Sequence, residues 1–338
     1  MRSSTTRWKL TDGPVVVTGA GGFIGSHVVE ALARRGARVR ALVHYNAQGT
    51  IGALRFIEPA LLETIEIVRG DVQDPYAVRS LLRGVEAVFH LAALIGIPYS
   101  YVAPASYVAT NIGGTLNILE GARVEGLARV IVTSTSETYG TAQYTPIDER
   151  HPLVAQSPYA ATKIGADHLA LSYYRSFELP VTVVRPFNTF GPRQSARAVI
   201  PTIVAQALRD SEEVRLGSLA PRRDLSYVED TARGFLVLAE RPEAIGKVTN
   251  LGTGASRSVK EMVEAVGRIV GRRLSVVEDA ARVRPERSEV NELCADASAA
   301  RALGWSPQVT FEDGLARVVE FVRAHEADFA SAAERYHI

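Results

Sequence analysis

The sequence is almost free of cysteine, since Cys294 is the single one among 338 residues. One thiol cannot form a disulfide within the chain, and this composition is typical of a reducing compartment. Long apolar runs are also missing: none approaches the roughly 20 residues that cross a bilayer, and the first ten residues lack the apolar core of a signal peptide. We therefore expect a cytoplasmic protein with no membrane partner.

An excess of charge of either sign is absent as well. Lys plus Arg number 38 and Asp plus Glu number 37, which gives a net charge of +1 at pH 7. Such a protein has no general attraction for nucleic acid or for an anionic surface, so an anionic ligand must be held by local groups. The seven histidines show no metal-binding spacing with cysteine or carboxylate. We expect neither a nucleic-acid partner nor a metal site.

A glycine-rich turn follows the first apolar segment. Residues 14–17 read as a buried strand, the turn runs from Thr18 to Gly25, and a periodic apolar helix continues to a stop at Gly36. In this context the three turn glycines allow the tight turn, the approach of backbone N–H groups to a pyrophosphate, and close packing of helix on sheet. We assign these roles to Gly19, Gly22 and Gly25, and favour dinucleotide binding over an ordinary tight turn.

The acid that usually selects NAD is missing from the end of the second strand. A carboxylate there accepts from the ribose 2′-hydroxyl, but after Glu30 the next acidic residue is Glu58. The arginine cluster that would favour the 2′-phosphate of NADP is missing too, with only Arg40 and His44 as candidates. We favour NAD and leave NADP open. The other cofactor contacts that we expect lie at the glycine turn and at strand ends: Phe23, Ile24, His44, Asn46, Asp71, Val72, Leu91, Ala92 and Ala93. We expect Tyr159 and Lys163 to contact the cofactor as well.

The stretch from Ser134 to Lys163 carries the reactive groups. Tyr159 and Lys163 are four residues apart on an expected helix, so they point into the same space. A free tyrosine, with a pKa of about 10, is a poor base, and a close ammonium favours its charged form. We predict that Tyr159 is a general base for a hydroxyl, with its pKa lowered by Lys163. Such a pair alone is more often a surface contact, but the glycine turn on the same sheet favours catalysis.

Polar residues follow the apolar strand at residues 130–133. Open α/β sheets place their ligands at the carboxyl ends of the strands. Thr135, Ser136 and Glu137 should therefore face Tyr159 across a bound substrate. His90, at the end of the preceding strand, fits a buried core histidine better than a ligand.

Arginines recur on expected loops in the second half of the chain. The stretches 191–193 and 220–224 read as loops that carry Arg193 and Arg223, and a later loop carries Arg284 and Arg287. A guanidinium fork can bind two phosphate oxygens at once, so we favour a diphosphate ligand over solvated surface charge. We predict a dinucleotide-binding domain over residues 1–185, with 224–252 packing back onto it. Residues 186–338 should form mainly a smaller α/β domain that binds the substrate.

Several short motifs follow one another along the chain: Gly19-x-x-Gly22-x-x-Gly25, Tyr159-x-x-x-Lys163, Arg185-Pro186-Phe187-Asn188, Arg223-Asp224 and Gly304-Trp305. In this order they resemble the extended short-chain dehydrogenase/reductase family over nearly the whole chain. The resemblance implies a Rossmann-type doubly wound parallel sheet, tightly held NAD(P) and a nucleotide-diphosphate sugar as substrate. It also implies that Asn188, Val199 and the arginines bind this substrate, and that the helices at 106–124 and 157–177 form a homodimer.

Within this family, three runs are most similar to the NAD-dependent 4,6-dehydratases of legionaminic acid biosynthesis: 90–101, 134–142 and 193–198. Those enzymes act on a nucleotide-linked N-acetylglucosamine, GDP-linked in the characterised type. The similarity implies that Tyr159 takes the 4-hydroxyl proton while hydride leaves C4, and that Thr135 holds that oxygen. Glu137 would then take the C5 proton, water would leave C6, and hydride would return there. The sequence leaves GDP and UDP open as the nucleotide, and it leaves the sugar open.

Ser136 departs from the 4,6-dehydratase pattern. Many of these enzymes have Thr-Asp-Glu where this chain has Thr135-Ser136-Glu137, and the aspartate protonates the leaving 6-hydroxyl. Here either Glu137 performs both transfers or a water held by Ser136 helps. The same Thr-Ser-Glu occurs in UDP-glucuronate decarboxylases, so decarboxylation, or 4-epimerisation of a UDP-linked hexuronate or hexose, is the rival interpretation. A non-catalytic dinucleotide sensor is a third, disfavoured by the intact Tyr159 and Lys163.

Overall fold

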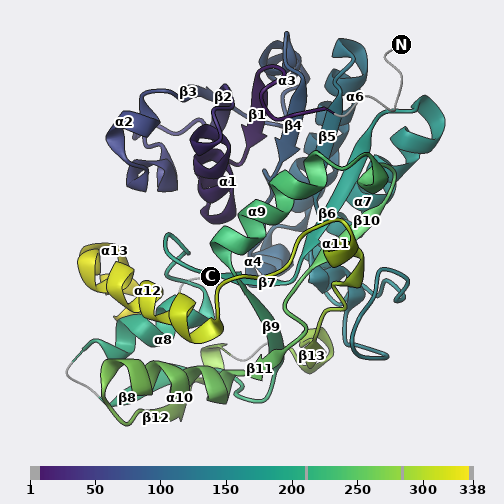
Figure 1. The fold of residues 1–338 in the computed structure, drawn as a ribbon. Helices are drawn as coiled ribbons and strands as arrows, with labels where there is room; N and C mark the ends of the chain where they lie inside the picture. Colours follow the sequence, from purple (N-terminus) through teal and green to yellow (C-terminus); the bar gives the residue numbers. More distant parts are fainter. Residues whose placement is uncertain (1–7, 210–211, 283–284, 335–338) are drawn as a thin grey trace.

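The computed structural model describes residues 8–209, 212–282 and 285–334. Seven strands form its largest sheet: β1 (Val15–Thr18), β2 (Val39–His44), β3 (Glu66–Gly70), β4 (Ala87–His90), β5 (Arg129–Thr133), β6 (Val181–Pro186) and β10 (Val248–Leu251). All of them are parallel and lie in the order β10-β6-β5-β4-β1-β2-β3 (Figure 1). The strand order reverses between β1 and β4, which is the doubly wound arrangement. The predicted Rossmann-type α/β fold is confirmed.

Strand β1 shows why these apolar segments form a central sheet. Val15 and Val17 contact the core on one face and Val16 contacts the core on the other, and all three are fully buried. One face is covered by α1 (Phe23–Arg34) and α9 (Val228–Ala239), and the opposite face by α3 (Pro75–Leu82), α6 (Gly114–Glu125) and α7 (Pro158–Phe177) (Figure 1). A parallel sheet covered on both faces requires strands that are apolar almost throughout.

The C-terminal unit, as we call the remaining layers, is built on two small sheets. The first contains β7 (Asn188–Phe190), β9 (Arg222–Tyr227), β11 (Ser256–Ser258) and β13 (Glu292–Leu293), and the second pairs β8 (Glu213–Leu216) with β12 (Ser275–Glu278). Around them pack α8 (Val199–Ala207), α10 (Val259–Val270), α12 (Phe311–Ala324) and α13 (Glu326–Glu334), which share one apolar core with β8 and β9 (Figure 1).

Short helical turns complete the described chain. They are η1 (Gly52–Phe56), α2 (Pro59–Leu62), α4 (Ile97–Val102), α5 (Pro104–Tyr107), the π-helical η2 (Val108–Gly113), η3 (Ser136–Tyr139), η4 (Pro242–Ala244), η5 (Ala280–Arg282), η6 (Glu286–Ser288) and α11 (Ser298–Ala302).

The prediction that residues 220–224 form a loop is wrong, because Arg222 begins strand β9. Residues 223–227 are buried, and β9 pairs with β7, β11 and β13, so it is the central strand of the smaller sheet. Proline and two arginines in succession read as a loop locally. Pairing with strands from three other parts of the chain overrides that pattern.

The chain returns to the large sheet after β9. Helix α9 packs on α1, and β10 pairs with β6 at the edge of the sheet. The exact division into two domains near residue 185 stays a prediction.

A cluster that we call the aromatic clasp joins the C-terminal helices to the first half of the chain. The ring of Phe56, at the end of η1, lies 5.1 Å from that of Phe321 and 4.9 Å from that of His325. Beside it Arg55 pairs with Asp328 at 2.7 Å. At the other end of η1, the N–H of Ala53 donates to the carbonyl of Gly21 at 2.8 Å. The clasp therefore connects α12 and α13 to the glycine-rich turn through a single short segment.

Asp224 holds the end of β10 against β9. Its buried carboxylate accepts from the N–H groups of Thr253 and Gly254 at 2.8 Å and from that of Ala295 at 3.0 Å. It also accepts from the Thr253 hydroxyl at 2.6 Å. One side chain thereby satisfies backbone donors from two separate loops.

Replacing this side chain should destabilise the protein strongly. Asp224→Ala leaves three backbone donors without their acceptor, and we expect the free energy of unfolding to fall by about 3 kcal/mol or more. Urea unfolding followed by circular dichroism measures it. As a control, Glu66→Ala removes the exposed partner of Arg40 and should change stability by less than about 1 kcal/mol. Equal effects of the two substitutions would contradict the role of Asp224.

Candidate active site

The glycine-rich turn is shaped to hold a pyrophosphate. Gly19 has a φ of +67°, and a Cβ there would lie 2.7 Å from the backbone nitrogen of Ala92. A Cβ on Gly25 would lie 2.1 Å from the carbonyl oxygen of Gly19. Helix α1 begins after Gly22 with no side-chain cap and no acid in its first turn. Its first N–H groups are therefore free to bind an anion, and the residues fit the pyrophosphate of a dinucleotide.

The adenosine side of this site lies at the ends of β2 and β3. His44 Nδ1 lies 3.8 Å from Asp71 Oδ2, and both side chains are exposed. Asn46 shapes the following loop, since its Oδ1 accepts from the Thr50 N–H at 3.1 Å and its Nδ2 donates to the His44 carbonyl at 3.2 Å. Val72 is buried in the core beside α6. These predicted contacts therefore lie together at the edge of the sheet.

Arg40 is not a candidate for binding a 2′-phosphate. Its Nε donates to Glu66 at 2.9 Å and its Nη1 to the carbonyl of Leu81 at 2.6 Å. The side chain is thus engaged away from the strand end, which argues against Arg40 as a group that binds a 2′-phosphate.

The ends of β1 and β4 are joined by the hydroxyl of Thr18. It accepts from the N–H groups of Leu91 at 3.2 Å and Ala92 at 3.1 Å, and it contacts His90 Nδ1 at 2.8 Å. Nε2 of His90 contacts the Thr115 hydroxyl at 3.1 Å. Burial, with a smaller effect of the Lys163 charge, lowers the pKa of His90 to about 3. His90 is therefore a neutral core histidine, as predicted, and Leu91, Ala92 and Ala93 continue from it half-buried.

Helix α7 places Tyr159 and Lys163 one turn apart, as the sequence predicted. Ser157 caps the helix by accepting from the Ala160 N–H at 3.1 Å. Both reactive side chains are buried, and Lys163 Nζ donates to the carbonyl of Thr133, at the end of β5, at 2.6 Å. Burial lowers the pKa of Lys163, an effect partly offset by the carboxylate of Asp167.

The predicted lowering of the Tyr159 pKa is wrong. Burial raises this pKa well above its ordinary value, the contact with the Thr135 hydroxyl opposes that rise, and the Glu137 carboxylate adds to it. The expected effect of Lys163 is not among the main causes, because its ammonium is turned to Thr133. Helical spacing predicted which residues lie next to the phenol. It did not predict that the phenol is buried, and burial disfavours the charged form of tyrosine.

Thr135 and Glu137 lie close to the phenol, whereas the predicted position of Ser136 at the substrate stays a prediction. Thr135 caps η3 by accepting from the Glu137 N–H at 3.3 Å, Ser136 is buried, and Glu137 is half-buried. Glu137 is close enough to Tyr159 for its charge to raise the pKa of the phenol. The structure thus brings a phenol, a hydroxyl and a carboxylate together at the carboxyl end of β5. Their catalytic roles stay a prediction.

Asn111 supports this site in a way that the sequence did not show. It lies in the π-helical turn η2, a feature often found at functional sites. Its Oδ1 accepts from the Leu94 N–H at 2.8 Å, and its Nδ2 donates to the Leu94 carbonyl and the Thr162 hydroxyl, both at 3.0 Å. The loop after β4 is thereby fixed to α7. The sequence suggested a structural polar contact for Asn111, but several other polar residues share the helical stretch 106–124 and nothing in it indicated these partners.

Gln156 was missed as well, and it connects the site to the C-terminal unit. Its Oε1 accepts from the Thr141 N–H at 2.5 Å, and its Nε2 donates to the carbonyl of Arg287 at 3.0 Å. The loop after η3 and the segment around η6 are thus held against the start of α7. No local pattern marks a glutamine for this role.

The predicted substrate residues fall into different settings. Asn188 is half-buried, and its Oδ1 has no hydrogen-bond partner in the described part of the chain, which suits a ligand contact. Val199 is 38 % exposed at the start of α8, and the side chain of Arg287 is exposed. Arg284 lies outside the described residues.

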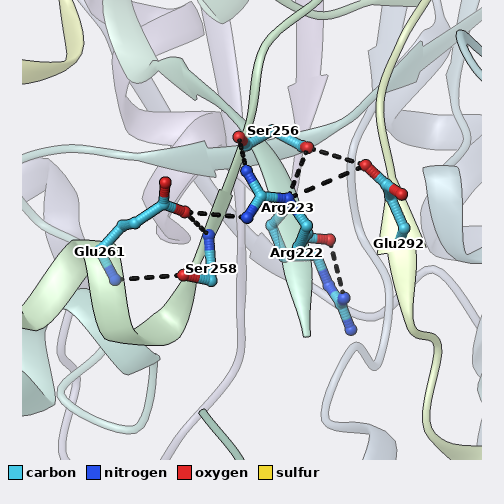
Figure 2. A network of polar contacts seen from close by, with 6 residues as sticks. All are labelled: Arg222, Arg223, Ser256, Ser258, Glu261 and Glu292. Atoms are coloured by element: carbon cyan, nitrogen blue, oxygen red, sulfur yellow. Dashed lines mark hydrogen bonds and ion pairs between the residues drawn. The ribbon is translucent and has the colours of Figure 1, made fainter. Parts of the chain in front are cut away.

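Arg223 differs from its neighbour Arg222 (Figure 2). Arg222 donates to Ser256 and to Glu261. Glu261 also forms the capping box that starts α10 with Ser258. Arg223 extends away from that network, is buried, and donates to Glu289 at 3.2 Å. A diphosphate that binds Arg223 would compete with this carboxylate.

Arg193 is paired within the protein, and its contact with a diphosphate stays a prediction. Its Nη2 donates to Glu30 of α1 at 2.6 Å, and its φ of +68° lies in the left-handed region that side chains rarely adopt. The turn therefore sends the guanidinium to the third turn of α1. Residues 191–193 do form a loop, as predicted. Nothing in the sequence indicated Glu30 as the partner of Arg193, because the two residues are 163 positions apart.

Two kinds of site are missing from residues 8–209, 212–282 and 285–334. No helix there has the length and apolar character that a membrane crossing requires. No group of three or more histidine, cysteine, aspartate or glutamate side chains in these ranges could hold a metal ion.

The open glycine turn, with a buried tyrosine and lysine one helical turn apart beside it, defines a dinucleotide-dependent enzyme of the extended short-chain dehydrogenase/reductase class. The model of a family described as GDP-mannose 4,6 dehydratase matches residues 16–318. The chain belongs to this family, and is an enzyme of the nucleotide-sugar dehydratase and epimerase group.

Relatives of both activities are similar along almost their whole length. A dTDP-glucose 4,6-dehydratase of Actinoplanes sp. is 33% identical over 322 residues, which covers 93% of this chain and 98% of the relative. A UDP-glucose 4-epimerase of Mycolicibacterium smegmatis is 32% identical over 315 residues, covering 91% and 98%. A crystal structure of a dTDP-glucose 4,6-dehydratase from Streptomyces venezuelae is 30% identical with a TM-score of 0.83, covering 94% of this chain and 99% of that one. It was solved with NAD bound, which supports NAD as the cofactor of this fold.

The glycine turn gives a direct test of cofactor binding. Gly25→Ala places a methyl group against the backbone of the turn and should distort it. We expect NAD affinity to fall roughly tenfold or more, which corresponds to a loss of binding free energy above about 1.4 kcal/mol. Calorimetric titration with NAD measures it. Gly113→Ala is the control, since a Cβ there meets only an ordinary contact at 3.9 Å. Unchanged affinity in the Gly25 variant would exclude this turn as the binding site.

Proposed function

We propose that this protein is an NAD-dependent 4,6-dehydratase acting on GDP- or UDP-linked N-acetylglucosamine in the cytoplasm. The observation that carries the proposal is the carboxylate of Glu137 beside the buried phenol of Tyr159. Oxidation and reduction at one carbon require the tyrosine alone, whereas elimination also requires a base for the neighbouring C–H bond. The similarity to 4,6-dehydratases over more than nine-tenths of the chain supports the same activity.

Each step then falls to a residue of this chain. Tyr159 would take the proton of the 4-hydroxyl, and Thr135 would hold that oxygen by a hydrogen bond. NAD, when bound, would supply the carrier for the hydride that leaves C4 and comes back to C6. The ketone at C4 acidifies the C5 hydrogen, which Glu137 would remove. Gly19, Gly22 and Gly25 would hold the pyrophosphate of the cofactor.

The departure of water needs an acid, and the aspartate expected there is replaced by Ser136. Having taken the C5 proton, Glu137 is itself an acid, so it can hand that proton to the leaving 6-hydroxyl. A water held by Ser136 is the alternative donor. When hydride reaches C6, C5 needs a proton again, and the proton that Tyr159 took from the 4-hydroxyl supplies it by way of solvent, so the net change is the loss of one water.

The rival function is 4-epimerisation or decarboxylation in the same family. The run Thr135-Ser136-Glu137 and the similarity to the mycobacterial UDP-glucose 4-epimerase support it. An epimerase returns the hydride to C4, so its product keeps the mass of the substrate. A decarboxylase acts on a hexuronate and releases CO₂. The products therefore separate the candidates.

Incubation with GDP- or UDP-N-acetylglucosamine should give a product lighter by the mass of one water, detected by mass spectrometry. Glu137→Gln should slow this loss at least about a hundredfold, because it removes the base for C5. Glu66→Gln, at an exposed ion pair on β3, is the control and should keep full activity. A product of unchanged mass, or release of CO₂ from a UDP-hexuronate, would replace the dehydratase by its rival.

We also propose that the protein is a homodimer. The outer surfaces of η2, α6 and α7 carry apolar side chains that are 38 to 52 % exposed: Val108, Leu116, Val124, Tyr174 and Phe177. Apolar residues gathered on adjacent helices are typical of a surface buried by a partner. Pairing of α6 and α7 with the same helices of a second copy would bury them.

Charged substitutions on these helices should separate the subunits. The double variant Leu116→Glu with Val124→Glu places two carboxylates in the proposed interface, so sedimentation should show a monomer where the parent protein is a dimer. Val277→Glu, at an exposed site on β12, is the control and should stay dimeric. A parent protein that sediments as a monomer at micromolar concentration would rule out the dimer.

A further inference from the structure

A buried ion pair lies behind the reactive residues. Arg185 Nη2 pairs with Asp167 Oδ2 at 2.8 Å, and each side chain is only 2 % exposed. The Ser134 hydroxyl donates to the same carboxylate oxygen at 2.5 Å and accepts from Arg185 Nε at 3.1 Å. Three elements, α7, β5 and β6, are therefore joined at one carboxylate.

The position of this pair connects it to the site. Asp167 follows Lys163 by one helical turn, so the two side chains share a face of α7. Ser134 directly precedes Thr135, and Arg185 lies three residues before Asn188. The Arg185 guanidinium also stacks 4.6 Å from the ring centre of Tyr139, the last residue of η3. The elements that carry the reactive groups therefore meet here.

The charges in this cluster do not balance. Arg185 and Lys163 are cations and Asp167 is the carboxylate between them, so the three side chains carry one net positive charge. Oδ1 of Asp167 has no hydrogen-bond partner among the described residues. Arg185 and Ser134 both bind Oδ2, which leaves part of the carboxylate charge to act on Lys163. In a buried environment of low dielectric constant this interaction is strong.

We propose that Asp167 is a positioning residue that keeps Lys163 protonated by offsetting the charge of Arg185, and that it sets the pH range in which the site works. The effect on cofactor binding stands independently of the substrate, while its effect on turnover rests on the proposed function. Breaking a buried ion pair by removing one partner leaves an uncompensated charge. Loss of Asp167 would leave Lys163 facing Arg185 alone.

The direction of the pH effect follows from the neighbours. The carboxylate of Asp167 raises the pKa of Lys163 and also that of Tyr159. Without it both pKa values fall, so the lysine loses its proton, and the phenol loses its own, at lower pH. The other titratable or charged groups around the cluster are Arg185 on β6, His90 on β4, Tyr107 on α5, and Glu137 and Tyr139 on η3.

Four variants separate an electrostatic role from a structural one. NAD affinity is titrated from about pH 6 to about pH 10.5, which spans the range in which a buried lysine loses its charge. Asp167→Asn should move the alkaline loss of affinity down by about one pH unit or more. Arg185→Gln should move it up, because the carboxylate then acts on Lys163 alone. The double variant should lie between the two. Ser134→Ala keeps every charge and should leave the pH dependence in place.

The outcomes decide the proposal even if one variant fails to fold. Opposite shifts in the two single variants support it, and the upward shift of Arg185→Gln suffices if Asp167→Asn is unfolded by circular dichroism. Affinity that is flat with pH in the parent protein, or reduced equally at every pH in the variants, overturns it and leaves a structural ion pair. If the NAD titrations shift as expected but no nucleotide sugar is converted, the proposed function fails and this inference stands.

Discussion

Parallel strands all end at the same edge of a sheet, and this constraint decides where chemistry can occur in this chain. Thr18, His90 and Thr133 end β1, β4 and β5, which are neighbours in the sheet. The glycine turn, the backbone that follows His90 and the residues after Thr133 are thereby brought together, although more than 100 residues separate the first from the last. Helix α7 then adds its phenol and ammonium over the end of β5.

Much of the fold could be predicted because its signals are local. The apolar strands, the glycine turn and the shared face of Tyr159 and Lys163 each depend on residues a few positions apart. The capping box of Ser258 and Glu261 is equally local, and the structure contains it. Parallel pairing follows from the alternation of strands and helices, so the sheet order was within reach of the sequence.

The errors concern contacts made over long distances in the chain. The pairing of Arg193 with Glu30 was not foreseen, and the stretch that holds Arg223 is a strand rather than a loop. The pKa of Tyr159 was expected to fall, but burial raises it. Partners far away in sequence and the degree of burial are set by the complete fold, and a local motif contains neither.

The buried site disfavours the charged forms of both Tyr159 and Lys163. Burial raises the pKa of Tyr159 and lowers that of Lys163, so the pair of opposite charges is disfavoured on both sides. In a buried environment of low dielectric constant, an added charge interacts strongly with its neighbours. A cationic ring beside the phenol would therefore have a larger effect here than at an exposed tyrosine, and the base would become active only with its cofactor in place.

The aromatic clasp has a mechanical consequence. Phe56 touches helices of the C-terminal unit, and η1, which it ends, is hydrogen-bonded to Gly21 in the turn that suits the pyrophosphate. If the C-terminal unit moved away from the sheet to admit a sugar, it would therefore also displace the glycine-rich turn. If the sugar exchanges while the dinucleotide stays bound, small loop motions that keep these rings in contact would be sufficient. The clasp therefore favours local loop motion over rigid-body opening of the C-terminal unit.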